Sequence, residues 1–380
     1  MPLYQAAQAM NAQWAVAPEI ELPPGGASID SRTVFPGDLF FCVPGERVDG
    51  HDYAAQALQK GALAVVAQRP IPEAAGPVLL VEDTVKALGR LAGFWRNKTR
   101  ARVVGVTGTA GKTTAKEWMA QLLSLDGRTA WNHLNLNNQI GLPLSILRSD
   151  GREKYWVLEA GISQRHDMDE LGAILRPDLA VILNVGPAHL DGLGDVRGVA
   201  ECKSKLLGWL TTDGRGLVSR DYPELKEAVW GASPGVERGA DVGERYLAFT
   251  TKEQESDESP LHLAPYRIRR LGRTESGLIE YRLDLDQDEI IVPLALSGEH
   301  MAENIIAAAG CTHMLGMDAE TIAQGLALLE PPVQRFQRYT GKGWTLIDDS
   351  YNANPLSMAA SLAAARDMAG WTSGSWYFSS

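Results

Sequence analysis

The chain has 380 residues, of which 45% are hydrophobic and 22% charged. These values exclude a single small domain and a wholly disordered chain, and at about 150 residues per domain they predict two or three domains. Its 36 basic and 47 acidic residues leave a formal net charge of −11, which argues against a broad nucleic-acid-binding surface but allows a local phosphate site.

Residues 1–98 alternate short apolar strands with helical stretches, and Pro or Gly clusters separate them. The expected strands are DLFFCV, ALAVVA and PVLLVE, and the expected helices are YAAQALQKG and TVKALGRLAGFWRNK. This pattern predicts a small N-terminal α/β domain.

The middle of the chain repeats a strand, loop and helix pattern. The β-branched run at 102–108 ends in glycine, and a helical spacing follows at 115–127. Two further apolar runs, at 154–161 and 179–186, are separated by a helical stretch, as in parallel β-α-β units. We therefore expect a doubly wound parallel sheet with helices on both faces.

The pattern of polar and apolar residues changes twice in the last third of the chain. Polar alternation over about 240–296 predicts an antiparallel patch attached to the central domain, and a helix follows it. After Pro331 and Pro332, WTLIDDSYNANP indicates a strand leading into a loop, and SMAASLAAARDMAG indicates a helix. The last ten residues carry no strand pattern, so we expect only the beginning of a third, Rossmann-like α/β domain. The predicted domains are 1–98, 99–328 and 329–380.

The sequence lacks two features that would direct the protein to a membrane or out of the cell. No apolar run approaches the roughly 18 residues needed to cross a bilayer, and the N-terminus lacks a basic start followed by an apolar core. We expect a cytoplasmic protein without membrane insertion. Cys42, Cys202 and Cys311 lie far apart without metal-ligand spacing, so we expect buried free thiols.

The strongest chemical pattern lies between the strand at 102–108 and its helix. Glycines there let backbone N–H groups approach phosphate oxygens, Lys112 can reach terminal phosphates, and the Thr113 hydroxyl can bind Mg²⁺. The usual GxxxxGK[ST] spacing would place glycine at Val106, so the loop is a variant form. An empty glycine-rich turn is the alternative, but the position after a buried strand favours ATP binding. The predicted ATP-binding segment is Thr107, Gly108, Thr109, Ala110, Gly111, Lys112, Thr113 and Thr114.

Two other polar residues follow buried strands. Glu159 ends the strand YWVLE, where a carboxylate at the sheet edge can hold Mg²⁺, and His189 follows the next strand. Each alone is more often structural, but loops at the carboxyl ends of parallel strands converge, which favours one site with Lys112. Lys203 looks like an ordinary helix lysine.

Taken together, these motifs resemble those of the Mur ligase family, over about residues 25–370. The resemblance is carried by Asp30-Ser31-Arg32, PGDLF, Asp49-Gly50-His51, TGTAGKTT, NNQIGLP, Glu159-Ala160-Gly161, NVGPAHLDG, Gly298-Glu299-His300 through Asn304, and DDSYNANP. TGTAGKTT marks the wider superfamily, whereas LNNQIGLP and DDSYNANP are most similar to the ligases that act last on the growing peptide.

The resemblance implies an ATP-dependent, ADP-forming ligase that joins D-alanyl-D-alanine to UDP-N-acetylmuramoyl-tripeptide through an acyl phosphate, in peptidoglycan precursor synthesis. It implies a monomer that uses ATP and two Mg²⁺ ions and binds no nucleic acid. Lys112, Glu159, His189 and Lys203 would be catalytic. The metal ligands would be Thr113, Glu159, His189 and a carbamylated Lys203. The ATP contacts would include Asn304, Arg335 and Asp349. The contacts with the UDP-linked substrate would be Ser31, Arg32, Asn137 and Asn138.

Two alternatives remain open on the sequence, and a third is disfavoured. A sister ligase would add a single amino acid to the UDP-linked peptide. A nucleotide-binding fragment with impaired catalysis would follow from the incomplete third domain, since the later part of that domain supplies much of the amino-component pocket in the family. A folate polyglutamylating ligase shares the phosphate loop but should lack the Asp30-Ser31-Arg32 domain.

Overall fold

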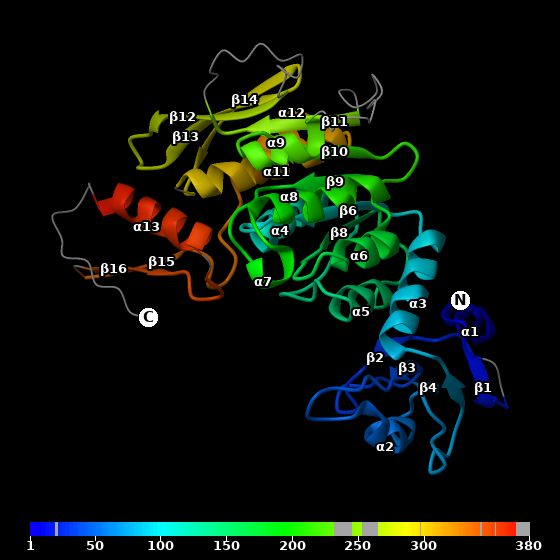
Figure 1. The fold of residues 1–380 in the computed structure, drawn as a ribbon. Helices are drawn as coiled ribbons and strands as arrows, with labels where there is room; N and C mark the ends of the chain where they lie inside the picture. Colours follow the sequence, from blue (N-terminus) through cyan, green and yellow to red (C-terminus); the bar gives the residue numbers. More distant parts are fainter. Residues whose placement is uncertain are drawn as a thin grey trace. The chain divides into compact units, whose positions relative to one another are not determined.

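The computed structural model describes residues 1–19, 22–231, 245–252, 265–296, 298–342, 344–353 and 355–369. The chain forms two compact units (Figure 1). The first unit comprises Met1–Ala101, Asn132–Lys154 and Asp169–Arg176, and the second comprises Arg102–Trp131, Tyr155–Met168 and Pro177–Ser380. The C-terminal segment 371–380, for which no strand was expected, lies outside the described residues.

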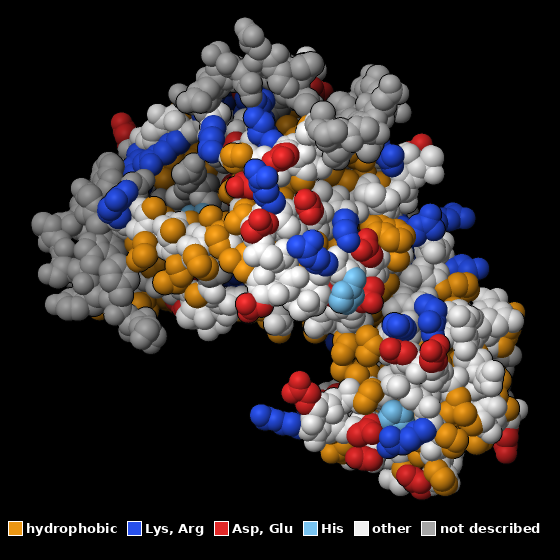
Figure 2. All heavy atoms as spheres, in the orientation of Figure 1, with side chains coloured by type: hydrophobic (Ala, Val, Ile, Leu, Met, Phe, Trp, Pro, Cys, Tyr) orange, Lys and Arg blue, Asp and Glu red, His pale blue; other side chains and the backbone are white. Residues whose placement is uncertain are grey.

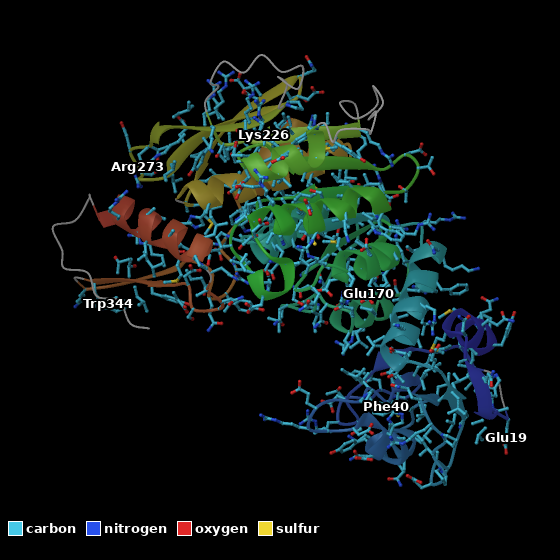
Figure 3. All side chains as sticks on the ribbon, in the orientation of Figure 1. Glu19, Phe40, Glu170, Lys226, Arg273 and Trp344 are labelled. Atoms are coloured by element: carbon cyan, nitrogen blue, oxygen red, sulfur yellow. The ribbon has the colours of Figure 1, made fainter. Side chains whose placement is uncertain are left out.

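The first unit is built on a five-stranded sheet of order β1-β5-β4-β3-β2, parallel except for β1. All four residues of β3 and of β4 are buried, as expected for strands covered on both faces, and Phe40 of β3 is labelled in Figure 3. The three predicted strands and two predicted helices are confirmed. The elements are α1 (Leu3–Met10), β1 (Gln13–Val16), β2 (Gly26–Ser28), β3 (Asp38–Phe41), α2 (Ala54–Gln59), β4 (Ala64–Ala67), β5 (Val78–Leu80), α3 (Thr84–Lys98) and α5 (Gly141–Leu147), with α6 (Asp167–Leu175) divided between the units.

The second unit holds a nine-stranded sheet of order β14-β13-β12-β11-β10-β9-β6-β8-β7. All pairs from β7 to β12 are parallel, which confirms the predicted parallel sheet. Its strands are β6 (Arg102–Thr107), β7 (Thr129–Trp131), β8 (Tyr155–Glu159), β9 (Leu179–Ile182), β10 (Arg215–Ser219), β11 (Tyr246–Thr250), β12 (Tyr266–Arg273), β13 (Ile279–Leu285) and β14 (Asp288–Leu294). Strand order reverses at β6, and ligands bind such sheets at the carboxyl edge beside that reversal.

One sequence expectation fails within this sheet. The antiparallel patch was expected from about residue 240, but β11 pairs in parallel with both β10 and β12. Antiparallel pairing begins only at β12 with β13 and continues to β14. Alternation of polar and apolar residues reports which faces of a strand are covered and carries no information about strand direction, so the pattern could not separate β11 from the hairpins.

Helices cover the second sheet and complete its core. They are α4 (Lys112–Leu123), α7 (Leu190–Leu193), α8 (Val196–Ser204), α9 (Pro223–Trp230), α11 (Glu299–Met314) and α12 (Ala319–Leu326), with a 3-10 turn at Lys205–Trp209. Trp118 of α4 and Ile305 of α11 belong to one buried cluster with strand residues such as Val106 and Leu217. This packing places Asn304 of α11 against Gly111, just before the first turn of α4.

The C-terminal part of the second unit is a short hairpin and a helix. β15 (Gln337–Gly341) pairs antiparallel with β16 (Trp344–Asp348), and α13 (Pro355–Ala369) follows. Trp344, labelled in Figure 3, is 58% exposed. Apolar side chains gather over α13 in Figure 2, where Met358 is exposed while Ala364 is buried.

The cysteines and the lengths of the helices bear on two further predictions from the sequence. Cys42, Cys202 and Cys311 are free and buried, as predicted. In the described ranges, every helix is too short or too polar for a membrane span.

Candidate functional site

The glycine-rich loop joins the end of β6 at Thr107 to the start of α4 at Lys112. Gly111 precedes the helix with φ of +75°, a conformation that glycine adopts without the strain a side chain would bring. A Cβ atom at Gly111 would also overlap the side-chain oxygen of Asn304 on α11. The first turn of an α-helix leaves backbone N–H groups without intrahelical acceptors, so this loop presents donors and positive potential suited to a phosphate.

The loop backbone is held from the neighbouring strand by Asn184, which follows β9. Asn184 Oδ1 accepts hydrogen bonds from the N–H groups of Thr109 at 3.0 Å and Ala110 at 2.8 Å. Its Nδ2 donates to Glu303 Oε2 of α11 at 2.8 Å. Neither Asn184 nor Glu303 was predicted from the sequence to act at this site, although Asn184 begins the motif NVGPAHLDG.

Oxygen ligands for a divalent cation lie at the other end of the loop. Thr113 Oγ1 donates to Glu159 Oε2 at 2.9 Å, and Glu159 is buried at the end of β8. Arg335 donates to the same hydroxyl at 3.2 Å, and its guanidinium carbon lies 4.0 Å from the ring centre of Tyr351. A hydroxyl and a carboxylate are oxygen donors of the kind that Mg²⁺ prefers, so Thr113 and Glu159 fit a magnesium site.

Three lysines surround this carboxylate. Lys203 Nζ donates to the carbonyl of Gly108 at 2.8 Å, and Lys112 Nζ lies 3.4 Å from the carbonyl of Thr109. Burial lowers the pKa of Lys112, while Glu159 opposes that effect. Burial, together with the nearby charge of Lys112, lowers the pKa of Lys203 well below its usual value. Lys116, one turn further along α4, is fully buried, and burial lowers its pKa as well. Burial therefore disfavours the charged forms of these lysines, and an anionic ligand beside them would favour the charged forms.

A cavity of about 520 Å³ opens beside the loop, within the size range of small-molecule sites. Ala110, Gly111, Asn304, Arg335 and Asp349 are among the residues that line it. Asn304 Oδ1 is buried and has no hydrogen-bond partner in the described part of the chain. An unpartnered buried acceptor costs roughly 1–3 kcal/mol, so a ligand that donates a hydrogen bond here would relieve that cost.

The structure does not bring every predicted residue to this site. His189 lies at the start of α7 with φ of +52° and an exposed side chain, and within the described ranges it forms no hydrogen bond to Lys112 or Lys203. Asp349 lies at the cavity, where its carboxylate accepts hydrogen bonds from the backbone of Phe336 at 3.1 Å and from Ser361.

The predicted substrate-binding residues all lie in the first unit. Ser31 is buried and donates to Gln56 at 2.7 Å. Arg32 is exposed and pairs with Asp30 at 2.7 Å, and this hydrogen bond lowers the pKa of Asp30 to about 2. Asn137 is half-buried. Asn138 Oδ1 accepts the N–H group of Gly141 at 2.8 Å, so part of its side chain holds the first turn of α5.

The sequence matches two family descriptions. Residues 106–312 match the Mur ligase middle domain, and residues 25–96 match the Mur ligase family catalytic domain. The chain is 33% identical over 343 residues to the UDP-N-acetylmuramoyl-tripeptide--D-alanyl-D-alanine ligase of Escherichia coli (strain K12), which covers 90% of this chain and 72% of that protein. It is 31% identical to the enzyme of the same name from Bacillus subtilis (strain 168), covering 91% and 71%.

Solved structures give the same result for the fold. Crystal structure I of MurF from Acinetobacter baumannii superposes with a TM-score of 0.80 at 29% identity, covering 94% of this chain and 74% of that one. MurF ligase from Thermotoga maritima in complex with ADP has a TM-score of 0.75 at 29% identity, covering 89% and 74%. Both similarities extend over the two units described above.

Proposed function

The chain belongs to the Mur ligase family, and on that premise we infer that it is an ATP-dependent ligase that joins D-alanyl-D-alanine to UDP-N-acetylmuramoyl-tripeptide in peptidoglycan precursor synthesis. The observation that carries this inference is the phosphate loop with Lys112 beside a cavity of about 520 Å³, in a chain that aligns over 90% of its length with the Escherichia coli ligase. The ADP complex of the Thermotoga maritima relative supports ATP as the nucleotide.

We propose that the cavity of the second unit holds ATP. The segment from Thr107 to Thr114, with Lys112 at its centre, would bind the β- and γ-phosphates through backbone N–H groups and the ammonium group. Asn304 would accept a hydrogen bond from the adenine amino group, since its buried oxygen has no partner in the described ranges. Arg335 and Asp349, which also line the cavity, would contact the ribose and phosphates.

Magnesium is the proposed cofactor, with two ions. Thr113 and Glu159 would hold the first ion, and when bound it would supply positive charge to the β- and γ-phosphates. For a second ion the proposed ligands are His189 and Lys203. An ammonium group is no metal ligand, but the lowered pKa of Lys203 favours the neutral amine, which can react with CO₂ to form a carbamate and release a proton.

The proposed reaction has two steps. A carboxylate oxygen of the tripeptide attacks the γ-phosphorus, the bond to the β-phosphate oxygen breaks, and ADP leaves behind an acyl phosphate. The amine of D-alanyl-D-alanine then attacks the acyl carbon, loses a proton, and expels phosphate. The first step brings two anions together, which costs about 4 kcal/mol at 4 Å and an effective dielectric constant of 20. Lys112 offsets this repulsion, so the chain acts mainly by positioning and charge neutralisation.

The UDP-linked substrate is proposed to bind the domain 1–98, with the central domain 99–328 binding ATP and the segment 329–380 contributing Arg335 and Asp349. Ser31 and Arg32 would contact the uridine diphosphate, and Asn137 and Asn138 would line the path of the peptide. Because Asn138 Oδ1 already holds α5, its amide nitrogen is the group left to donate. We further propose a cytoplasmic monomer, the cytoplasmic location resting on the consumption of ATP.

The test is phosphate release from Mg-ATP with purified protein. We expect release only when UDP-N-acetylmuramoyl-tripeptide and D-alanyl-D-alanine are both present. Lys112→Ala should abolish turnover while its circular dichroism spectrum and melting temperature stay close to those of the unsubstituted chain. Release with a single amino acid and the UDP-linked dipeptide would instead indicate a sister ligase. Mg-ATP binding without release would indicate a nucleotide-binding protein that does not ligate.

A further inference from the structure

Glu303 lies one hydrogen-bonded residue away from the phosphate loop and is itself among the residues that line the cavity. We propose that Glu303 is a positioning residue for ATP binding: it orients the Asn184 amide so that Asn184 Oδ1 holds the N–H groups of Thr109 and Ala110. This inference rests on the proposed ATP site and assigns it a residue on α11 that sets the shape of the loop.

The orientation of the Asn184 amide decides whether the loop backbone is satisfied. A side-chain amide has one acceptor oxygen and one donor nitrogen. The oxygen meets two backbone donors at 3.0 and 2.8 Å, so a rotation of the amide by half a turn would place N–H groups against N–H groups. Glu303 Oε2 accepts from Nδ2 at 2.8 Å, so its acceptor oxygen matches the orientation that satisfies both backbone N–H groups. A hydrogen bond between residues 119 positions apart therefore stabilises the loop.

The burial of Glu303 argues against a role in filling the core. The residue is only 7% exposed, and a buried carboxyl group is costly unless it is hydrogen-bonded. Its contact with Ser219 Oγ is 3.5 Å long, at the limit for a hydrogen bond, whereas the contact with Asn184 is short. Burial raises the pKa of Glu303 to about 8, so the carboxyl group is largely neutral at pH 7 and adds little negative charge near the phosphates.

The next residue on α11 acts on the same loop. Asn304 lies against Gly111, so consecutive residues of one helix turn face the two ends of the loop, one through Asn184 and one directly. Any shift of α11 relative to β9 would therefore alter both contacts. Because Glu303 also lines the cavity, its action through Asn184 has to be separated from a direct contact with the nucleotide, which an Asn184→Ala background does.

The experiment measures the dissociation constant of Mg-ATP by titration calorimetry on the full chain. Glu303→Leu, which fills the same space without an acceptor, should weaken binding about tenfold. Glu303→Gln keeps an acceptor oxygen and should restore the dissociation constant to within about twofold of that of the unsubstituted chain. Ser219→Ala is the matched control, because it removes another hydrogen-bond partner of the same carboxyl group without touching Asn184, and it should change binding less than twofold.

A double substitution separates positioning from general destabilisation. If Glu303 acts through Asn184, then Glu303→Leu should add no further loss in an Asn184→Ala background. Losses that multiply in the double variant, or equal affinity of Glu303→Leu and the unsubstituted chain, would overturn the proposal. Failure of Glu303→Gln to restore binding would also overturn it. Absence of Mg-ATP binding by the unsubstituted chain would be a different result, because it would contradict the proposed function itself.

Discussion

The substitution Glu303→Gln should remove a pH-dependent loss of unfolding free energy. Burial, and to a lesser extent the nearby Asp221 carboxylate, raises the pKa of Glu303 from 4.5 to about 8. The unfolded chain releases this proton near pH 4.5 and the folded chain only near pH 8, so between these values the folded state holds more protons. Stability contributed by the protonated group is complete below pH 4.5 and is lost as the pH rises through 8.

The size of the effect follows from the difference between the two pKa values. At 1.36 kcal/mol per pKa unit, the shift corresponds to at most about 5 kcal/mol of unfolding free energy between pH 4.5 and pH 8. Glutamine resembles the protonated carboxyl group but does not titrate. We therefore expect Glu303→Gln to match the unsubstituted chain near pH 5 and to exceed it by a few kcal/mol at pH 9.

Urea unfolding followed by circular dichroism at pH 5, 7 and 9 measures this difference directly. Comparing the two chains at each pH removes the contributions of all other titrating groups, because both chains carry them. Asp318→Asn is a useful control, since Asp318 is an exposed helix cap whose pKa is lowered and so lies below this pH range, and its effect on stability should therefore stay constant from pH 5 to pH 9. A stability difference between Glu303→Gln and the unsubstituted chain that stays constant from pH 5 to pH 9 would refute the reasoning.

Three further outcomes are expected. Gly111→Ala should weaken Mg-ATP binding at least about tenfold in calorimetry, because φ of +75° is strained for alanine and its Cβ would overlap Asn304 Oδ1; unchanged affinity would show that the loop can relax. Glu159→Gln should raise the Mg²⁺ concentration for half-maximal phosphate release about tenfold, since an amide oxygen lacks the carboxylate charge; an unaltered Mg²⁺ titration would remove Glu159 from the metal site. Asn138→Ala should lower the unfolding free energy by about 1 kcal/mol through loss of the hydrogen bond at the start of α5, and a stability equal to that of the unsubstituted chain would argue against that role.

Structural features that depend only on short stretches of sequence were predictable. The β-branched run before the loop, the glycines within it and the helical spacing after it are all local. β6 and the loop form where they were expected, and α4 begins at Lys112, three residues before the expected start of the helix. The convergence of loops at one sheet edge also follows from parallel strands, and Thr113 does meet Glu159 there. His189 satisfies the same rule in the sequence, yet its side chain is exposed, because the direction of a side chain depends on the turn that carries it.

Contacts that join distant segments were not predictable in this way. In the sequence Glu303 is indistinguishable from other polar residues of a helix. Its contact with Asn184 depends on the packing of α11 near β9, which no local pattern encodes. A weak signal exists at Asn138, since an asparagine shortly before a helix commonly holds the first helical N–H groups. The resemblance of NNQIGLP to a family motif favoured a substrate role instead, although both roles can be served by different atoms of one amide.

The pKa shifts of the buried groups near the loop have opposite signs but one physical cause. Burial disfavours charge, so it lowers the pKa values of Lys112 and Lys203 and raises that of Glu303. A bound polyphosphate would raise all three pKa values, because its negative potential favours protonation of every neighbour. Lys112 would then regain the charge that binds phosphate, while Glu303 would stay neutral and keep accepting from Asn184. A carboxyl group can therefore lie close to a phosphate loop without repelling its ligand, provided that it is buried deeply enough to remain protonated.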